Sequence, residues 1–255
     1  MTVPIDTRSI DPSAIIERQR HIDGYLLDES AAIWCFLLQE QMQTWPWGGG
    51  SRGDYLEIGA YKGKSASILA AFTAAGGNHL TIVDPDILPE LRVTLDAIVG
   101  NVEYLSIRSE DLMTHECHRR QHRRLAFAHI DGMHRFAAVQ NDLRVCEDML
   151  SDFGILTLDD FHTDLFPQIP AAVYRYLYSG VSDLSLFLIG FNKAYLCRNI
   201  AKSYFKRVIH ERALSTLADL GFSLTLVKTD RHDAFDAYTL VPWQGAALYG
   251  NEHAP

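Results

Sequence analysis

The feature that most constrains this chain is a regular alternation of short apolar runs with stretches of helical spacing, between residues 54 and 158. The apolar runs predict strands over 55–58, 79–83, 102–107, 125–130 and 155–158. The stretches between them predict helices, the clearest of which cover 65–75, 88–99 and 134–150. Strands and helices that alternate in this way are typical of βαβ units, which build a parallel sheet. The fold class is therefore expected to be α/β.

The segments on either side are expected to extend the same domain. Residues 1–50 predict a peripheral N-terminal helical segment, a cap or lid, with one helix capped near Asp28. The core is expected to span residues 51–200 and to end in a hairpin built from two β-rich runs, 184–189 and 194–197. Residues 201–255 are expected as an extension with one long helix and two strands, over 201–220, 223–227 and 237–241.

Composition argues against several partners. The formal net charge is −9, and a phosphate backbone repels an acidic surface, so no nucleic-acid partner is expected. The one basic run, residues 119–124, is interpreted as a solvated loop. No apolar stretch approaches the ~20 residues of a membrane span, and no signal peptide is recognised. The four cysteines form no CxxC pair, so a cytoplasmic protein is expected.

Acidic residues stand at the carboxyl ends of several predicted strands. A buried parallel strand is normally apolar, and ligands of open α/β sheets bind at the carboxyl ends of the strands. Acids that recur at this position therefore indicate a ligand crevice. They are Glu57, Asp84, Asp131, Asp159 and Asp160.

The first strand leads into a turn with Gly59 and Gly63, which is wider than the GxGxxG turn of a dinucleotide site. Glu57 at this strand end would repel phosphate but accept from an ammonium. The pattern favours a cofactor with an amino-acid portion and no phosphate, S-adenosylmethionine; the alternative is that both glycines only permit a tight turn. Asp84 is expected to hold ribose hydroxyls, unless it only forms an Asp-Pro turn. Ser109 is expected near adenine, unless it only caps a helix.

Three carboxylates on neighbouring strand ends repel one another unless a cation lies among them. Asp131, Asp159 and Asp160 are therefore predicted to bind Mg²⁺, which prefers oxygen ligands. A metal there would lower the pKa of a substrate hydroxyl. His134, at the expected start of a helix, is the predicted general base, and His162 is a second candidate for base or ligand. The alternative for each histidine is an ordinary surface or capping residue.

These residues together resemble a known family. The segments 55–65, 130–134 and 158–161 resemble class I S-adenosylmethionine-dependent methyltransferases, in the branch of small bacterial macrocin-type and catechol-type metal-dependent O-methyltransferases. Residues 189–196 resemble the terminal hairpin of that branch, and the resemblance covers about residues 54–198. It implies a Rossmann-like fold with a mostly parallel seven-stranded sheet, a terminal antiparallel hairpin and helices on both faces.

The resemblance also implies roles for the site residues. Cofactor contacts are expected from Glu57, Gly59, Tyr61, Gly63, Ser65, Asp84, Ser109 and Asp131. The metal ligands of the family fall on Asp131, Asp159 and Asp160. Catechol-type enzymes have a lysine base three residues after the first ligand, where this chain has His134. Some macrocin-type members use an acid two residues after that ligand; Met133 stands there, which favours His134. Tyr61 and His162 are expected to contact the substrate.

The function predicted is therefore O-methylation of a small-molecule or sugar hydroxyl, with a saccharide or polysaccharide acceptor included. A homodimer is expected. Two other classes stay open. One is an NAD-type oxidoreductase on the same architecture, against which the spacing of Gly59 and Gly63 argues. The other is a non-catalytic binding protein, in which the basic run 119–124 would meet an acidic partner or RNA.

Overall fold

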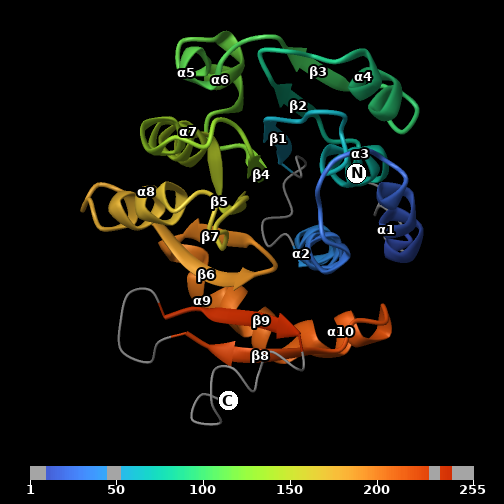
Figure 1. Cartoon of the computed structure of the whole chain (residues 1–255), viewed down its shortest axis with the longest axis vertical. Coiled ribbons are helices and arrows are strands. Elements are labelled where there is room, and N and C mark those ends of the chain that lie inside the picture. Colours follow the sequence, from blue (N-terminus) through green and yellow to red (C-terminus); the bar gives the residue numbers. More distant parts are fainter. Residues whose placement is uncertain (1–9, 45–52, 230–235, 243–255) are drawn as a thin grey trace, which may run out of the picture.

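The computed structural model describes residues 10–44, 53–229 and 236–242 of the chain. One sheet runs through the molecule in the order β3-β2-β1-β4-β5-β7-β6-β9-β8 (Figure 1). Neighbouring strands from β3 to β5 pair in parallel, and β7 pairs antiparallel with both β5 and β6. The predicted α/β class and hairpin are confirmed. The strands are β1 (Asp54–Ile58), β2 (Leu80–Val83), β3 (Val102–Leu105), β4 (Leu125–Ile130), β5 (Leu150–Leu158), β6 (Leu184–Gly190), β7 (Lys193–Arg198), β8 (Leu224–Lys228) and β9 (Tyr238–Pro242).

Helices cover both faces of the sheet, as the resemblance implies. Successive strand residues point to opposite faces, so Tyr55 and Leu56 of β1 belong to two different hydrophobic clusters. The first cluster packs beneath α1 (Pro12–Arg20), α2 (Asp28–Thr44), α3 (Ala66–Gly76), α4 (Pro89–Asp96), α9 (Asn199–Val208) and α10 (Leu214–Asp219). The second packs beneath α5 (Ser109–Leu112), α6 (Glu116–Gln121), α7 (Phe136–Met149) and α8 (Gln168–Leu177).

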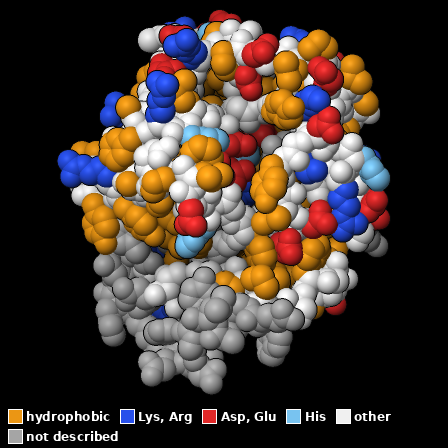
Figure 2. Space-filling view, in the orientation of Figure 1, with side chains coloured by type: hydrophobic (Ala, Val, Ile, Leu, Met, Phe, Trp, Pro, Cys, Tyr) orange, Lys and Arg blue, Asp and Glu red, His pale blue; other side chains and the backbone are white. Residues whose placement is uncertain are grey.

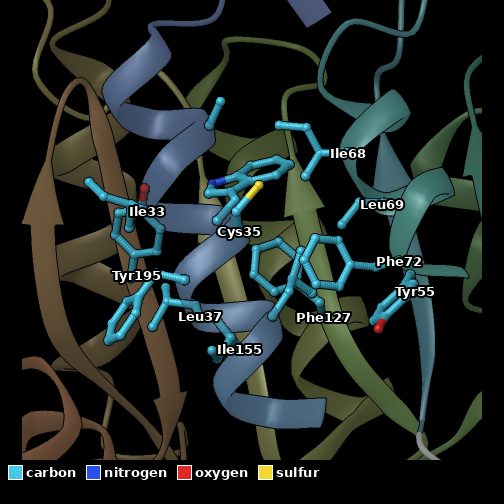
Figure 3. Packing of buried hydrophobic residues seen from close by; sticks show 14 of the residues in the cluster. Ile33, Cys35, Leu37, Tyr55, Ile68, Leu69, Phe72, Phe127, Ile155 and Tyr195 are labelled. Carbon is cyan, nitrogen blue, oxygen red and sulfur yellow. The ribbon is translucent and has the colours of Figure 1, made fainter. Parts of the chain in front are cut away.

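Helix α2 lies in the core, which corrects the expectation of a peripheral segment. Every residue from Ala31 to Leu38 is buried, because this stretch is apolar on all sides and no face of it suits water. Figure 3 shows its side chains among those of Phe72 and Phe127, from α3 and β4. The Ser30 hydroxyl also donates to the carbonyl of Phe191 at 2.9 Å, which ties α2 to the β6–β7 turn. Residues 1–9 and 45–50 of the expected N-terminal segment lie outside the described residues.

The sheet has nine strands in the described part of the chain, not seven. Strand β9 pairs in parallel with β6, and β8 pairs antiparallel with β9. Without them, β6 would be an edge strand with unpaired backbone groups. The expected helix over 201–220 is interrupted by a π-helical turn, Ile209–Ala213. The C-terminal extension belongs to the same sheet, and its residues 230–235 and 243–255 lie outside the described residues.

The basic run is partly helical, which corrects the expected loop. Arg119 and Arg120 lie in α6, and the side chain of Arg120 pairs with Glu103. Arg123, after the helix, pairs with Asp152. These acids neutralise part of the run. Among the described helices, none is both long and apolar enough to cross a membrane.

Candidate functional site

A cavity of about 450 Å³ opens at the carboxyl ends of β1, β2 and β4. It is bounded on the other side by the α1–α2 loop, where Tyr25 is 82% exposed. Larger hollows lie over α7 and α8 and between α1, α3 and α4, and neither contains a predicted site residue. The structure brings five predicted cofactor residues to the cavity wall: Gly59, Tyr61, Ser65, Asp84 and Asp131.

The β1 turn fits between the ends of β2 and β4 only because residue 59 is glycine. Gly59 has φ +80°, and a Cβ there would lie 2.1 Å from the carbonyl oxygen of Asp131. The backbone N–H of Asp131 donates to Ile58 at 2.8 Å, and that of Ala60 donates to Asp84 Oδ2 at 3.0 Å. The strand-end acids of β2 and β4 are thus held around one turn, as the sequence predicts.

Two predicted cofactor residues do not reach the cavity wall. Glu57 is fully buried beneath the turn, where its carboxylate accepts from the Ser65 hydroxyl and lies 3.1 Å from His129 Nδ1. Gly63 faces α4, since a Cβ there would lie 2.9 Å from Leu91 Cδ1. Gly63 therefore permits close packing of the β1–α3 turn against α4.

Ser109 is also placed away from the cavity wall. It is the first residue of α5, and its side chain hydrogen-bonds to Asp142 on α7. Asp142 is fully buried, and burial raises its pKa to about 6, an effect that the charge of Glu110 reinforces. The pair joins α5 to α7, and a contact between Ser109 and adenine stays a prediction.

Replacement of Asp142 by asparagine is expected to stabilise the protein in a pH-dependent way. The pKa of the Asp142 carboxyl is raised on folding from 3.8 to about 6. Its ionisation therefore lowers the free energy of unfolding of the wild-type protein as the pH rises through about 6. A shift of two pKa units corresponds to about 3 kcal/mol in the free energy of unfolding. Loss of the contact with Ser109 would reduce this gain. Denaturant unfolding of both proteins at pH 4 and pH 8 checks this. The advantage of Asp142→Asn is expected only at pH 8; an equal difference at both values would contradict it.

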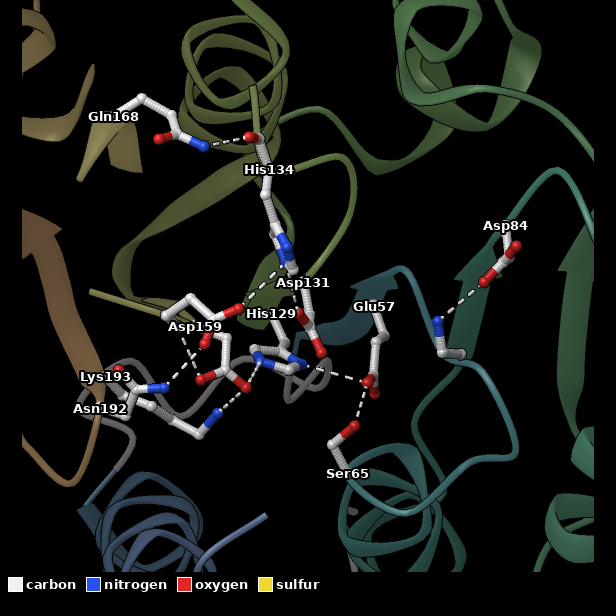
Figure 4. A network of polar contacts seen from close by, with 12 residues as sticks. Glu57, Ser65, Asp84, His129, Asp131, His134, Asp159, Gln168, Asn192 and Lys193 are labelled. Atoms are coloured by element: carbon white, nitrogen blue, oxygen red, sulfur yellow. Dashed lines mark hydrogen bonds and ion pairs between the residues drawn. The ribbon is translucent and has the colours of Figure 1, made fainter. Parts of the chain in front are cut away.

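His134 lies between two strand-end carboxylates (Figure 4). Its Nε2 is 3.4 Å from Asp131 Oδ1 and 3.2 Å from Asp160 Oδ2. The hydrogen bond to Asp131 raises the pKa of His134, burial opposes this, and the charge of Asp160 adds to the rise. Gln168 donates to the His134 carbonyl at 2.6 Å, and the Phe166 ring lies 4.2 Å away from the imidazole. His134 precedes α7 by two residues, so it is not on the helix as expected.

Asp160 is held in an uncommon backbone conformation, φ +54°, which directs its side chain toward the site. Asn192 Nδ2 donates to its Oδ1 at 2.8 Å, and burial raises the pKa of the carboxyl. Ligand atoms of Asp131, His134 and Asp160 lie within 4.8 Å of one another, close enough to bind one cation. Figure 2 shows acidic side chains gathered in a hollow in the middle of this face.

Asp159 points the other way, into the interior. Its Oδ2 forms an ion pair with the buried ammonium of Lys193, and its Oδ1 accepts from the backbone of Asp160 at 2.8 Å. Burial alone would raise the pKa of Asp159, but Lys193 and His129 outweigh burial and hold it below its usual value. Both oxygens have partners, but an Asp159 oxygen also lies within 4.8 Å of ligand atoms of His129 and Asp131, so the set of metal ligands stays a prediction.

His162 is exposed, and its ring contacts Phe161 at 5.6 Å between centroids. Its backbone N–H donates to Asn192 Oδ1 at 3.0 Å. Sequence reasoning missed Asn192, His129 and Lys193. His129 carried a signal, because a polar residue in the apolar strand β4 is unusual. Lys193 carried none, since a lysine after a hairpin turn is normally solvated.

A protein-family description of a methyltransferase domain matches residues 56–161, the span that holds β1 to β5 and the strand-end acids. Residues 56–161 therefore carry a methyltransferase domain. The predicted resemblance and class of enzyme are therefore confirmed, against the alternatives of an oxidoreductase and a non-catalytic protein. No curated protein matches the sequence.

Solved structures of methyltransferases share the fold of this methyltransferase. CalS11, a TDP-rhamnose 3'-O-methyltransferase of calicheamicin biosynthesis, is 14% identical over 77% of this chain and 96% of its own, with a TM-score of 0.51. MycE of the mycinamycin pathway, in complex with Mg and SAH, is 14% identical over 75% of this chain and 55% of its own, with a TM-score of 0.53. PaMTH1 of Podospora anserina, bound to SAH, is 14% identical over 74% and 88%, with a TM-score of 0.51.

Proposed function

We propose that this methyltransferase transfers a methyl group to a hydroxyl of a small molecule or sugar, with Mg²⁺ held by Asp131 and Asp160. One observation carries the proposal. Asp131 lines the cavity at the β1 turn, and its Oδ1 also lies 3.4 Å from His134 Nε2. The same carboxylate is therefore next to both the proposed cofactor cavity and the proposed base. The names of the structural neighbours, a sugar O-methyltransferase and a Mg-containing enzyme, support the same reaction.

The residues at the cavity suit a cationic cofactor without phosphate. Asp84 would hold the ribose hydroxyls, with Gly59, Tyr61 and Ser65 around the amino-acid end. Below them, Glu57 Oε2 is buried and has no hydrogen-bond partner among the described residues. This negative charge beneath the turn favours the ammonium and sulfonium groups of S-adenosylmethionine.

Proton removal is assigned to His134. The acceptor oxygen bonds to the methyl carbon as the carbon–sulfur bond breaks, and the hydroxyl proton passes to His134 Nε2. Gln168 holds the backbone carbonyl of His134, the Phe166 ring packs beside the imidazole, and Nε2 lies beside Asp131 and Asp160. Mg²⁺ held by Asp131 and Asp160 would supply Lewis acidity and lower the pKa of the hydroxyl. Holding the two reactants in line supplies much of the rate.

A cytoplasmic location, a homodimer and acceptor contacts from Tyr61 and His162 stay predictions. Tyr61 is 56% exposed at the cavity, where an acceptor can reach it. A polysaccharide acceptor is the most specific form of the proposal, and an acceptor panel tests it.

Removal of divalent cations is expected to abolish methyl transfer. The measurement is transfer of labelled methyl to a panel of sugar and phenolic acceptors, with EDTA and after addition of Mg²⁺. We expect EDTA to stop turnover and Mg²⁺ to restore it, because the two carboxylates then have a cation to bind the hydroxyl. Binding of S-adenosylhomocysteine, measured by calorimetry in EDTA, is the control and is expected to persist. Turnover that resists EDTA would make Asp131 and Asp160 structural acids.

A further inference from the structure

A connected set of charged side chains lies beneath the active-site carboxylates (Figure 4). Glu57 and His129 are fully buried, Lys193 is 1% exposed, and the Asp159 side chain is 11% exposed. His129 lies 3.1 Å from Glu57 through Nδ1 and 3.9 Å from Asp159 through Nε2. Charges are rarely buried so deeply unless they are paired, so the set calls for an explanation beyond packing.

Lys193 is the cation of this set, and three elements hold it. It starts β7, it pairs with Asp159 at the end of β5, and its Nζ lies 5.5 Å from the Trp34 ring of α2. Trp34 is itself fully buried, so the indole face adds a cation–π contact away from water. The ammonium is thus fixed inside the protein, against the inner oxygen of Asp159.

The adjacent acids Asp159 and Asp160 point in different directions, Asp159 into the interior and Asp160 into the site. Asp159 Oδ1 accepts from the backbone N–H of Asp160, which lies in the left-handed region with φ +54°. This turn sends the Asp160 side chain toward His134, 3.2 Å away, while Asp159 stays with Lys193. Asn192, next to Lys193 in the chain, holds Asp160 Oδ1 at 2.8 Å. The β6–β7 turn therefore positions both acids.

We infer that Lys193 is a positioning residue that withdraws Asp159 from the metal site, so that Asp131 and Asp160 are its carboxylate ligands. The inference rests on the proposed function, which places Mg²⁺ there. The three acids and Lys193 together carry two negative charges, which one divalent cation neutralises. Removal of the ammonium frees Asp159 and adds a negative charge beside the cation, so metal affinity should rise.

The test is calorimetric binding of Mn²⁺ to the full chain with S-adenosylhomocysteine. Asp160→Asn is expected to weaken binding by ~10-fold or more, because a ligand is lost. Lys193→Met is expected to tighten it by ~3-fold or more through the freed carboxylate. Lys193→Arg, which keeps the charge, is expected to restore the wild-type value. A merely structural role for Lys193 would not raise metal affinity.

A double variant, in which both members of the ion pair are replaced by neutral residues, tests the same inference if Lys193→Met fails to fold. In the double variant Asp159→Asn and Lys193→Met, Mn²⁺ affinity is expected to stay within ~3-fold of wild type, because no ligand is lost. Loss of affinity equal to that of Asp160→Asn would make Asp159 a ligand and overturn the inference alone. Absence of Mn²⁺ binding by the wild-type protein would overturn the proposed metal site and, with it, the inference.

Discussion

Replacement of His134 by alanine is expected to lower kcat for methyl transfer by ~10²–10⁴-fold, the usual contribution of a general base. The imidazole lies within 3.4 Å of both Asp131 and Asp160, the Phe166 ring packs beside it, and Gln168 holds the backbone carbonyl of His134. Since His134 does not line the cofactor cavity, the Kd of S-adenosylhomocysteine should change by less than ~3-fold. Turnover and calorimetric binding are the two measurements.

His162→Ala is the matched control. It removes an imidazole from the β5–α8 loop, where the ring is exposed and contacts Phe161. Its kcat should stay within ~3-fold of wild type, because the proposed proton transfer uses His134, and loss of an acceptor contact from His162 would raise KM instead. Full turnover by His134→Ala, or a larger loss in His162→Ala, would show that the base is assigned to the wrong residue.

Replacement of Gly59 by alanine is expected to cost about 3 kcal/mol or more in the free energy of unfolding. A Cβ there would lie 2.1 Å from the oxygen and 2.6 Å from the carbonyl carbon of Asp131, both of them backbone atoms. Neither backbone segment can easily move away, because the N–H of Gly59 donates to the carbonyl of Val83 at 2.9 Å and that of Asp131 donates to Ile58 at 2.8 Å. Any relaxation displaces Asp131, so cofactor binding should weaken as well.

Gly77→Ala separates backbone strain from collision. Gly77 ends α3 with φ +68°, but a Cβ there would meet nothing within 4 Å. Its cost should be the left-handed conformation alone, roughly 1 kcal/mol. Denaturant unfolding of both variants measures the difference. Equal losses at Gly59 and Gly77 would contradict the view that the β1 turn and the end of β4 are in contact.

The parallel core could be predicted because its signals are local. Apolar runs set the strands, and the carboxyl ends of parallel strands meet at one edge, so Asp84 and Asp131 were expected to converge and do. The direction of a side chain beyond the strand end is not determined by the local sequence pattern. It depends on Asp160 having a positive φ, which turns two adjacent acids apart.

Long-range pairing explains the other differences. Strands β8 and β9 were expected, but their partner is the free edge of β6, which no local pattern specifies. The Lys193–Asp159 pair joins residues 34 positions apart in the chain. Burial of α2 could have been predicted, since the stretch Ala31–Leu38 is apolar on every side. A surface helix would have shown one polar face.

A crystal structure with S-adenosylhomocysteine and Mn²⁺ tests the central claim most directly. We expect the cofactor product in the cavity at the β1 turn, with its sulfur on the side of Asp131. The anomalous signal of Mn²⁺ is expected at the carboxylates of Asp131 and Asp160, beside His134. Mn²⁺ at any other place, or S-adenosylhomocysteine outside this cavity, would contradict a metal-dependent O-methyltransferase built on these residues.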